Sequence, residues 1–226
     1  MAPRIVALIP MREHSVRVPL KNRRAFAGAP LYRWIVHALA RCPLIDEIVI
    51  DTDSSAIMED ARDLGDRVRV IERPVHLRED TLSMNEVLLH AVSVVDADLY
   101  LQTHSTNPLL RSETITRGLE RFLASAPAHD SLFSVTRLQT RLWDAHGKPL
   151  NHDLNVLLRT QDLPPVYEEN SCLYLFTRAS LEARRNRIGE RPLMFEIDAR
   201  EAQDIDEEID FRVAEHLMTE RLREAP

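Results

Sequence analysis

The 226-residue sequence has few of the residues on which several common protein classes depend. It holds only two cysteines, Cys42 and Cys172, which lie far apart in apolar runs. A disulfide framework is therefore excluded, and both are expected to be reduced core residues of a cytoplasmic protein. Its five glycines form neither GxGxxG nor GxxxxGK[ST], which argues against a dinucleotide fold or a P-loop.

Long hydrophobic runs and an excess of positive charge are also missing. No stretch approaches the roughly 20 apolar residues of a membrane span, and the apolar run before Arg12 is too short for a signal peptide. The formal net charge of -7 disfavours a general nucleic-acid or membrane-surface binder. The histidines lack zinc-ligand spacing, and no GxSxG elbow indicates a hydrolase.

What the sequence does contain is a regular alternation of short β-rich runs with segments of helical period. Strands are expected at 4–10, 47–50, 68–71, 99–102, 131–136 and 171–177, and helices at 30–40, 54–64, 83–95, 112–124 and 205–218. This alternation predicts an α/β fold with a mainly parallel sheet covered on both faces. We expect one domain over 1–226, with an excursion at about 138–170 that serves as a lid or a dimerisation arm. The run Arg184–Arg187 is interpreted as a solvated helix end.

The loop after the first strand is the most informative segment. From Arg12 to Arg24 it carries five cationic side chains within thirteen residues and no glycine. Ligands of parallel sheets bind at the carboxyl ends of the strands, so this loop is expected to hold an anion with guanidinium and ammonium groups. Ser15 and Asn22 supply neutral donors. A solvated charged loop is the alternative interpretation.

Two further segments carry candidate chemistry. Asp204 and Asp206 are two residues apart, and on an extended segment both carboxylates face one hard cation such as Mg²⁺. The alternative is an acidic cap at the start of the last helix. The segment from Gln102 to Arg111 is dense in neutral donors and suits a sugar or base pocket, or else a turn with capping residues.

These segments together resemble the CMP-N-acetylneuraminate cytidylyltransferase family and its CMP-Kdo relatives. The opening IVALIPMR with Ser15 and Lys21-Asn22, the segments ERPVHLREDTLS and LQ…NPLLR, then ENSCLYLF and DIDEEIDF follow the family order across nearly the whole chain. The resemblance implies a Rossmann-like, GT-A-like nucleotidyltransferase fold and a homodimer. It implies an enzyme that transfers CMP from CTP to the anomeric hydroxyl of an acidic keto-deoxy sugar and releases pyrophosphate.

The resemblance also implies roles for individual residues. Nucleotide contacts are expected from Arg12, Ser15, Arg17, Lys21, Asn22, Arg73 and Asp80, sugar contacts from Gln102, Arg159 and Asn170, Mg²⁺ binding from Asp204 and Asp206, and catalysis from Arg12, Lys21 and Asp206. Where the family has glycine and lysine in the first loop, this chain has His14 and Val16, with Arg17 as a substitute cation. Glu168 and Glu169 precede Asn170, so an acceptor carboxylate requires a compensating cation, for which Arg159 is the candidate.

Three other functions remain open at this point. The acceptor is an acid of another kind, such as a phosphonate, or the chain is a non-catalytic sensor of nucleotides or sugars. A glycosyltransferase is the third, because Asp51-Thr52-Asp53 follows a strand in mid-chain as a DxD metal site does there. A fold resemblance alone does not decide among them.

Overall fold

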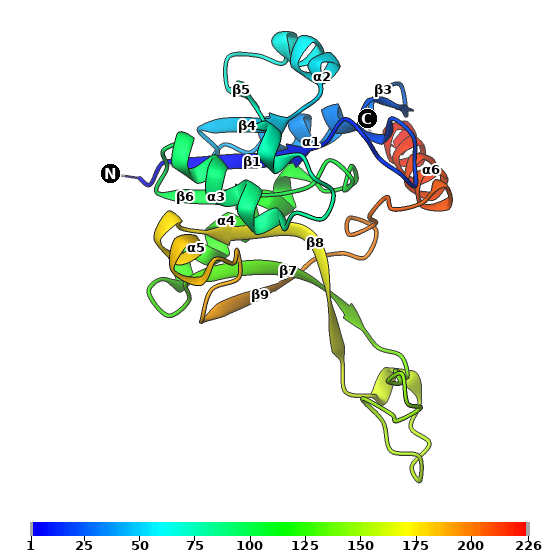
Figure 1. Ribbon diagram of the computed structural model, residues 1–226. Coiled ribbons are helices and arrows are strands. Elements are labelled where there is room, and N and C mark those ends of the chain that lie inside the picture. Colours follow the sequence, from blue (N-terminus) through cyan, green and yellow to red (C-terminus); the bar gives the residue numbers. More distant parts are fainter. Residues whose placement is uncertain (1, 225–226) are drawn as a thin grey trace.

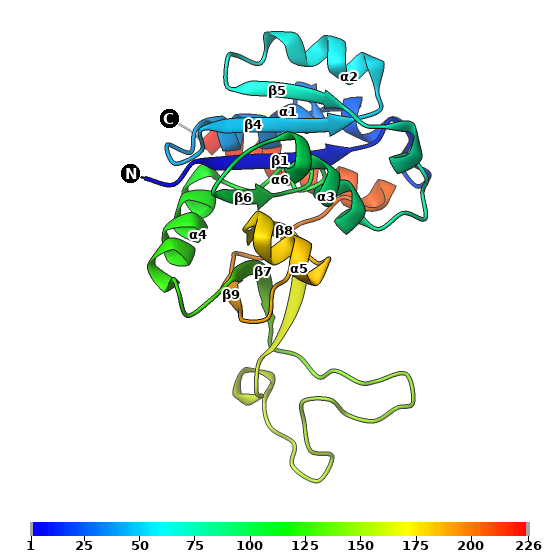
Figure 2. The same ribbon diagram turned by 60° about the vertical axis from the view of Figure 1, so that its left-hand side comes forward.

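The computed structural model describes residues 2–224 and contains one seven-stranded sheet in the order β5-β4-β1-β6-β8-β7-β9. Neighbouring strands are parallel except around β8, which runs antiparallel to both β6 and β7. Helices cover both faces (Figure 1 and Figure 2). The predicted mainly parallel α/β fold is thus confirmed.

The elements follow the predicted order closely. The strands of the large sheet are β1 (Ile5–Met11), β4 (Glu47–Thr52), β5 (Val68–Glu72), β6 (Leu99–Gln102), β7 (Ser131–Leu138), β8 (Val166–Phe176) and β9 (Pro192–Glu196). A small hairpin consists of β2 (Ala25–Phe26) and β3 (Ala29–Pro30). The α-helices are α1 (Leu31–Ala40), α2 (Ser55–Asp60), α3 (Met84–Val94), α4 (Ser112–Ser125), α5 (Arg178–Arg184) and α6 (Glu208–Glu224).

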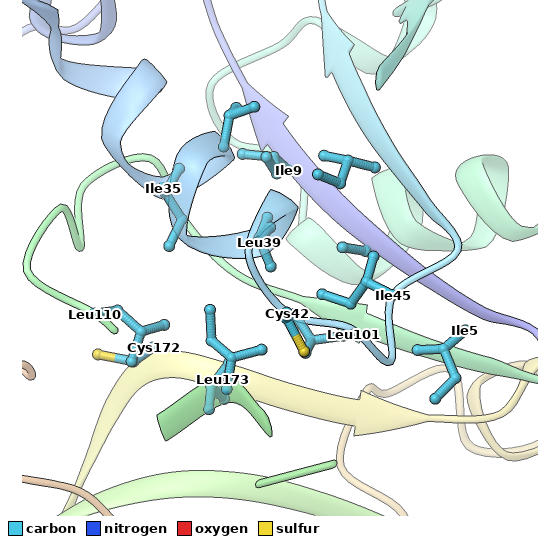
Figure 3. Close-up of a cluster of buried hydrophobic side chains, with 14 of the residues drawn as sticks. Ile5, Ile9, Ile35, Leu39, Cys42, Ile45, Leu101, Leu110, Cys172 and Leu173 are labelled. Carbon is cyan, nitrogen blue, oxygen red and sulfur yellow. The ribbon is translucent and has the colours of Figure 1, made fainter. Parts of the chain in front are cut away.

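The packing of the core explains why the sequence of β1 is a continuous apolar run. Its side chains alternate between the two faces of the sheet, and all seven residues are buried because both faces are covered. Ile5 and Ile9 pack with α1 and α4 on one face, whereas Val6 and Leu8 pack with α3 on the other. The first of these clusters is drawn in Figure 3, where Ile35 and Leu39 of α1 face the sheet.

The hairpin β2–β3 and the helix α5 were not among the predicted elements, and three further features differ from the sequence prediction. Strand β9 was not expected, because its residues alternate between half-buried and exposed at the edge of the sheet and form no apolar run. The predicted strand at 171–177 is the second half of a longer strand, β8, that runs against its neighbours. The last helix begins at Glu208 instead of Ile205, because Asp210 accepts hydrogen bonds from the amides of Asp206 and Glu207 and caps the helix there.

The reversed strand carries a local irregularity next to the site. The pairing of β7 with β8 shifts between Phe133 and Val135, and Ser171 adopts a left-handed backbone with φ of 59°. Because β8 runs opposite to β6, its amino-terminal half passes the edge where β6 ends. Glu169 and Asn170 are thereby brought to the carboxyl edge of the parallel strands.

The segment between β7 and β8, here called the excursion (residues 139–165), extends away from the sheet (Figure 1). It contains one short 3₁₀ turn at Thr160–Asp162 and an isolated bridge between Trp143 and Pro149. Large apolar side chains are exposed along it, with Leu157 at 89% and Leu154 at 65%. Within residues 2–224, no helix is long and apolar enough to cross a membrane.

Candidate active site

A cavity of about 380 Å³ lies at the end of β1, beneath the cationic loop. It is called the basic cavity below. All seven residues predicted to bind the nucleotide line it: Arg12, Ser15, Arg17, Lys21, Asn22, Arg73 and Asp80. His14, His104 and Ser105 are among the other lining residues. The structure therefore brings together seven predicted residues of which the first and last, Arg12 and Asp80, lie 68 positions apart in the sequence.

The glycine-free loop is held in place by side chains. The Asn22 amide donates to the Arg12 carbonyl at 2.9 Å and accepts from Ser105 Oγ at 2.7 Å. Asn22 thus ties the loop to the segment after β6. Leu20 adopts φ of 54°, a left-handed conformation at which the chain turns into the 3₁₀ helix Lys21–Arg23.

The cations of the loop lie against carboxylates and carbonyls at the rim of the basic cavity. Arg12 NH1 lies 2.5 Å from Asp80 Oδ1, and Arg17 NH2 lies 2.6 Å from Asp206 Oδ1. Lys21 Nζ donates to the Ile205 carbonyl at 2.5 Å. Burial lowers the pKa of Lys21, and the charges of Asp204 and Asp206 oppose that shift. The loop is consequently linked to the Asp204–Asp206 segment by both Arg17 and Lys21.

A second cavity of about 600 Å³ lies on the other side of that segment. It is called the acidic cavity, because five carboxylates line it: Glu168, Glu169, Asp204, Asp206 and Asp210. Asn170 lines it as well. Since Asp206 belongs to this wall and pairs with Arg17 of the basic cavity, the two cavities meet at the Asp204–Asp206 segment.

Asp204 and Asp206 have the chemistry that a hard cation prefers. Burial raises the pKa of Asp204, and the nearby negative charge of Asp206 raises it further. A divalent cation is the ligand that relieves both effects. Among residues 2–224, no group of three or more His, Cys, Asp or Glu side chains is arranged to hold a metal. Two carboxylates suit Mg²⁺, which completes its shell with water and substrate phosphate.

The residues considered for a DxD site have other partners. Asp51 pairs with Arg73, whose Nε lies 2.5 Å from Asp51 Oδ1, and the two side chains are 3% and 1% exposed. Asp53 Oδ1 accepts from the amide of Glu13 at 2.7 Å. Because Asp51 is committed to a buried ion pair, Asp51-Thr52-Asp53 does not present two free carboxylates to a metal, and the glycosyltransferase interpretation loses its support.

Two of the three sugar-binding candidates have structural roles within this chain. The Asn170 side chain accepts from Ser134 Oγ at 2.6 Å and donates to Thr136 Oγ1 at 3.0 Å, which holds the irregular pairing of β7 and β8. Arg159 lies on the excursion and pairs locally with Asp162 at 2.6 Å. Arg159 does not line either cavity of its own chain, because the excursion leads away from the sheet.

Gln102, the third candidate, lies behind both cavities in a cluster that sequence reasoning missed. Its Oε1 accepts from Arg187 NH1 at 2.6 Å, and its Nε2 lies 2.9 Å from His104 Nε2. Arg187 stacks 3.5 Å over the Tyr174 ring, and its side chain is only 16% exposed. The interpretation of Arg184–Arg187 as a solvated helix end was therefore wrong for Arg187. The charge run carries no sign of burial, which results from the packing of Arg187 against Tyr174 of β8 and Gln102 of β6.

Comparison with known proteins identifies the family. The sequence profile described as "Cytidylyltransferase" matches residues 6–223, nearly the whole chain. The chain belongs to the cytidylyltransferase family. The family that the motif order predicted is confirmed.

The relatives include enzymes named for acidic sugars. The chain is 29% identical to N-acylneuraminate cytidylyltransferase of Oncorhynchus mykiss over 93% of its length and 49% of that protein. It is 30% identical to CMP-N,N'-diacetyllegionaminic acid synthase of Legionella pneumophila, over 95% of this chain and 96% of that one. Several fish relatives are thus about twice as long, and the chain spans about half of them.

Solved structures share the fold of this chain. A CMP:2-keto-3-deoxy-manno-octonic acid synthetase complexed with CTP superposes with a TM-score of 0.68 at 16% identity, over 96% of this chain and 99% of that one. A 4-diphosphocytidyl-2C-methyl-D-erythritol synthase from Anaerococcus prevotii gives a TM-score of 0.70 at 11% identity, over 96% of each chain. At these identities the likeness establishes the fold of the cytidylyltransferases for this chain.

Proposed function

We propose that this chain transfers a cytidylyl group from CTP to the anomeric hydroxyl of an acidic sugar. Family membership supports the nucleotide, and relatives named for neuraminic, legionaminic and pseudaminic acids support the acceptor class. The observation that carries the proposal is the junction of the two cavities, where Arg17 and Lys21 contact the Asp204–Asp206 segment. A nucleotide in one cavity and an acceptor in the other meet at this junction.

In the proposed reaction the acceptor hydroxyl oxygen forms a bond to the α-phosphorus of CTP. The bond from that phosphorus to the bridging oxygen breaks, pyrophosphate leaves, and the hydroxyl proton is released. Arg12, Ser15 and Lys21 contact the triphosphate and neutralise its charge, and Arg17 substitutes for the lysine usual in the family. Positioning and charge neutralisation supply most of the rate enhancement in such transfers.

Asp204 and Asp206 are the residues that would hold Mg²⁺. Bound there, the ion would supply positive charge that stabilises the reacting phosphate. The paired carboxylates of a partly buried segment and the raised pKa of Asp204 support this assignment. Lys21 of the cationic loop contacts the same segment through the Ile205 carbonyl and helps to balance its negative charge.

The acceptor is proposed to be a keto-deoxy acid, and the acidic cavity requires a cation to tolerate its carboxylate. Glu169 accepts a hydrogen bond from Tyr174 and lies 3.9 Å from Arg187 NH2. Arg187, not Arg159, is therefore the cation that offsets Glu169 within one chain. A different acid, such as a phosphonate, uses the same loop and metal residues and remains the second acceptor class.

The chain is further proposed to act as a homodimer in the cytoplasm. The exposed apolar side chains of the excursion, among them Trp143, Leu154 and Leu157, are a surface that a second copy would cover. Arg159 lies on the same arm and would reach a partner's site only in such a dimer. Two free, buried cysteines agree with a reducing compartment.

The substitution Asp206→Asn tests the proposed metal and transfer site. We expect Mg²⁺-dependent pyrophosphate release to fall by about 10²-fold or more, because a carboxylate facing the transferred phosphate is lost. Glu207→Gln removes the same charge from an exposed neighbour and is expected to leave turnover within about twofold. Circular dichroism verifies that both variants fold. Near-normal turnover of Asp206→Asn would exclude the metal assignment.

A further inference from the structure

Arg187 is a mostly buried cation at the wall between the two cavities. Its NH1 lies 2.6 Å from Gln102 Oε1 and 3.4 Å from Nε2 of His104, which lines the basic cavity. On its other side NH2 lies 3.9 Å from Glu169 of the acidic cavity. The guanidinium also stacks on the Tyr174 ring, which limits its freedom to turn. Arg187 therefore contacts a wall residue of each cavity.

The contacts of Arg187 determine the orientation of the Gln102 amide. A guanidinium has only donors, so the Gln102 atom facing Arg187 NH1 is the acceptor Oε1. The amide nitrogen then points the other way, where it donates to the Thr103 carbonyl at 3.0 Å and lies 2.9 Å from His104 Nε2. The amide cannot be turned over without bringing two donors together.

The oriented amide in turn determines the tautomer of His104. Both neighbours of His104 Nε2, the Gln102 amide nitrogen and Arg187 NH1, are donors. Nε2 must therefore accept, and the single proton of the neutral ring resides on Nδ1. The chain Arg187–Gln102–His104 thus leaves the ring one N–H donor.

The charge around the ring agrees with a neutral His104. Burial is the main cause that lowers the pKa of His104, to about 3, and the positive charges of Arg187 and Lys21 lower it further. Glu169 lies on the far side of Arg187 and pairs with it. Protonation of Nε2 would place a third donor against two others, so geometry and charge favour the same form.

We propose that Arg187 is a positioning residue that acts through Gln102 to hold His104 as the neutral Nδ1–H tautomer, a donor to anionic oxygens of the ligand in the basic cavity. For its part in catalysis this inference rests on the proposed cytidylyl transfer. His104 lines the basic cavity, in which the triphosphate would lie, so its N–H donor would help to orient that group. A neutral donor does so without adding another fixed charge beside Lys21 and Arg187.

The tautomer of His104 is measured directly by ¹H–¹⁵N correlation NMR of the imidazole nitrogens in the wild-type protein, with His104→Gln used to assign the signals. We expect the proton on Nδ1 and no titration of His104 above about pH 5. A proton on Nε2, or a titration near 6.5, would overturn the proposal without reference to turnover.

Variants test whether Arg187 is the cause. In Arg187→Met the pKa of His104 is expected to rise, because one of the cations that lower it is gone, and both tautomers are expected to be populated. Arg187→Lys keeps the positive charge but not the paired N–H donors of the guanidinium. Its His104 pKa and tautomer population are expected to lie between those of the wild type and of Arg187→Met. Arg184→Met, which removes an exposed arginine paired with Glu190 on the preceding helix, is expected to change neither quantity. An unchanged His104 spectrum in Arg187→Met would overturn the proposal.

Kinetics separate positioning from simple stability. We expect Arg187→Met to lower kcat roughly ten- to a hundredfold with a smaller change in KM for CTP, because the donor is needed most where charge develops. Its pH profile is expected to gain an ionisation that the wild type lacks. If the wild type releases no pyrophosphate with any acid, the proposed function fails, while the NMR results still decide the role of Arg187.

Discussion

The buried ion pair of Arg73 and Asp51 makes a strong prediction about stability. Both side chains are almost fully inaccessible, and Arg73 NH2 also donates to the Asp51 carbonyl at 3.2 Å. Within the described part of the chain Asp51 Oδ2 has no hydrogen-bond partner. Burial raises the pKa of Asp51, and the charge of Arg73 opposes that shift. Asp51 therefore depends on Arg73 to remain ionised in the core.

Arg73→Met is expected to cost about 3–5 kcal/mol of unfolding free energy at pH 7, because it leaves a carboxylate buried without its counter-charge. Against a typical total of about 5–15 kcal/mol, this is a large share. Replacing both residues, as Arg73→Met with Asp51→Leu, removes both charges and is expected to lie within about 1–2 kcal/mol of the wild type. The two substitutions are thus expected to be strongly non-additive.

The sign of the pH dependence follows from the same argument. In Arg73→Met the folded-state pKa of Asp51 lies further above its unfolded value, so the folded protein binds the proton more tightly. Its stability is then highest below the unfolded pKa and declines as pH rises through the interval up to the folded value. The unfolding free energy that Arg73→Met loses relative to the wild type is expected to be smaller at pH 5 than at pH 7.

Urea denaturation followed by circular dichroism at both pH values measures these differences. Arg69→Met, in the strand β5 that Arg73 directly follows, is the matched control, since its pair with Glu47 spans 3.8 Å with the arginine 51% exposed. It is expected to cost less than about 1 kcal/mol. If Arg73→Met costs no more than Arg69→Met, or if the double variant loses the sum of the single losses, the reasoning is refuted. In the stable double variant, calorimetry with CTP then isolates the part of Arg73 in binding.

Three further predictions concern the site, the hairpin and the excursion. Asp204→Asn is expected to abolish Mg²⁺-dependent turnover yet raise the thermal midpoint of unfolding at pH 7. Burial raises the pKa of Asp204, so the stabilising contribution of this carboxyl is lost as pH rises above its pKa in the unfolded chain. A lower midpoint in calorimetry would contradict this. Ala27→Asn is expected to add about 0.5–1 kcal/mol to the free energy of unfolding measured in urea. Ala27 and Gly28 have φ of 45° and 94° in the β2–β3 turn, and such turns favour Asn-Gly. Any loss of stability would refute this prediction. Leu157→Asp, at an 89% exposed position of the excursion, is expected to yield monomers in sedimentation velocity while the fold stays intact, and an unchanged dimer would show that this surface is not the interface.

The parts of the fold that were predictable are those in which local pattern and final environment agree. The run from Ile5 to Met11 is buried on both faces, so its continuous apolar character reported a central parallel strand directly. The position of the cationic loop followed from the rule for carboxyl ends. All seven residues for which the family resemblance implied nucleotide contacts line one cavity. Here the sequence pattern contained the necessary information.

The remainder depends on contacts that only the complete fold supplies. Strand β9 has no apolar run because it lies at the sheet edge. The reversal of β8, with Asn170 holding its irregular pairing, is a tertiary feature that the ENSCLYLF motif does not reveal. Arg187 belongs to a run of charges typical of solvent, yet it is mostly buried against Tyr174 and Gln102. Asn22, predicted to contact the nucleotide, also ties the loop to the segment after β6, which its sequence position does not reveal.

Pyrophosphate release with each of the four nucleoside triphosphates, in the presence of Mg²⁺ and a panel of keto-deoxy sugar acids, tests the central claim most directly. We predict release with CTP alone, dependent on one class of acid and lost in Asp206→Asn. Release with another triphosphate, or none across the panel from a folded protein that also fails to bind CTP in calorimetry, would contradict it.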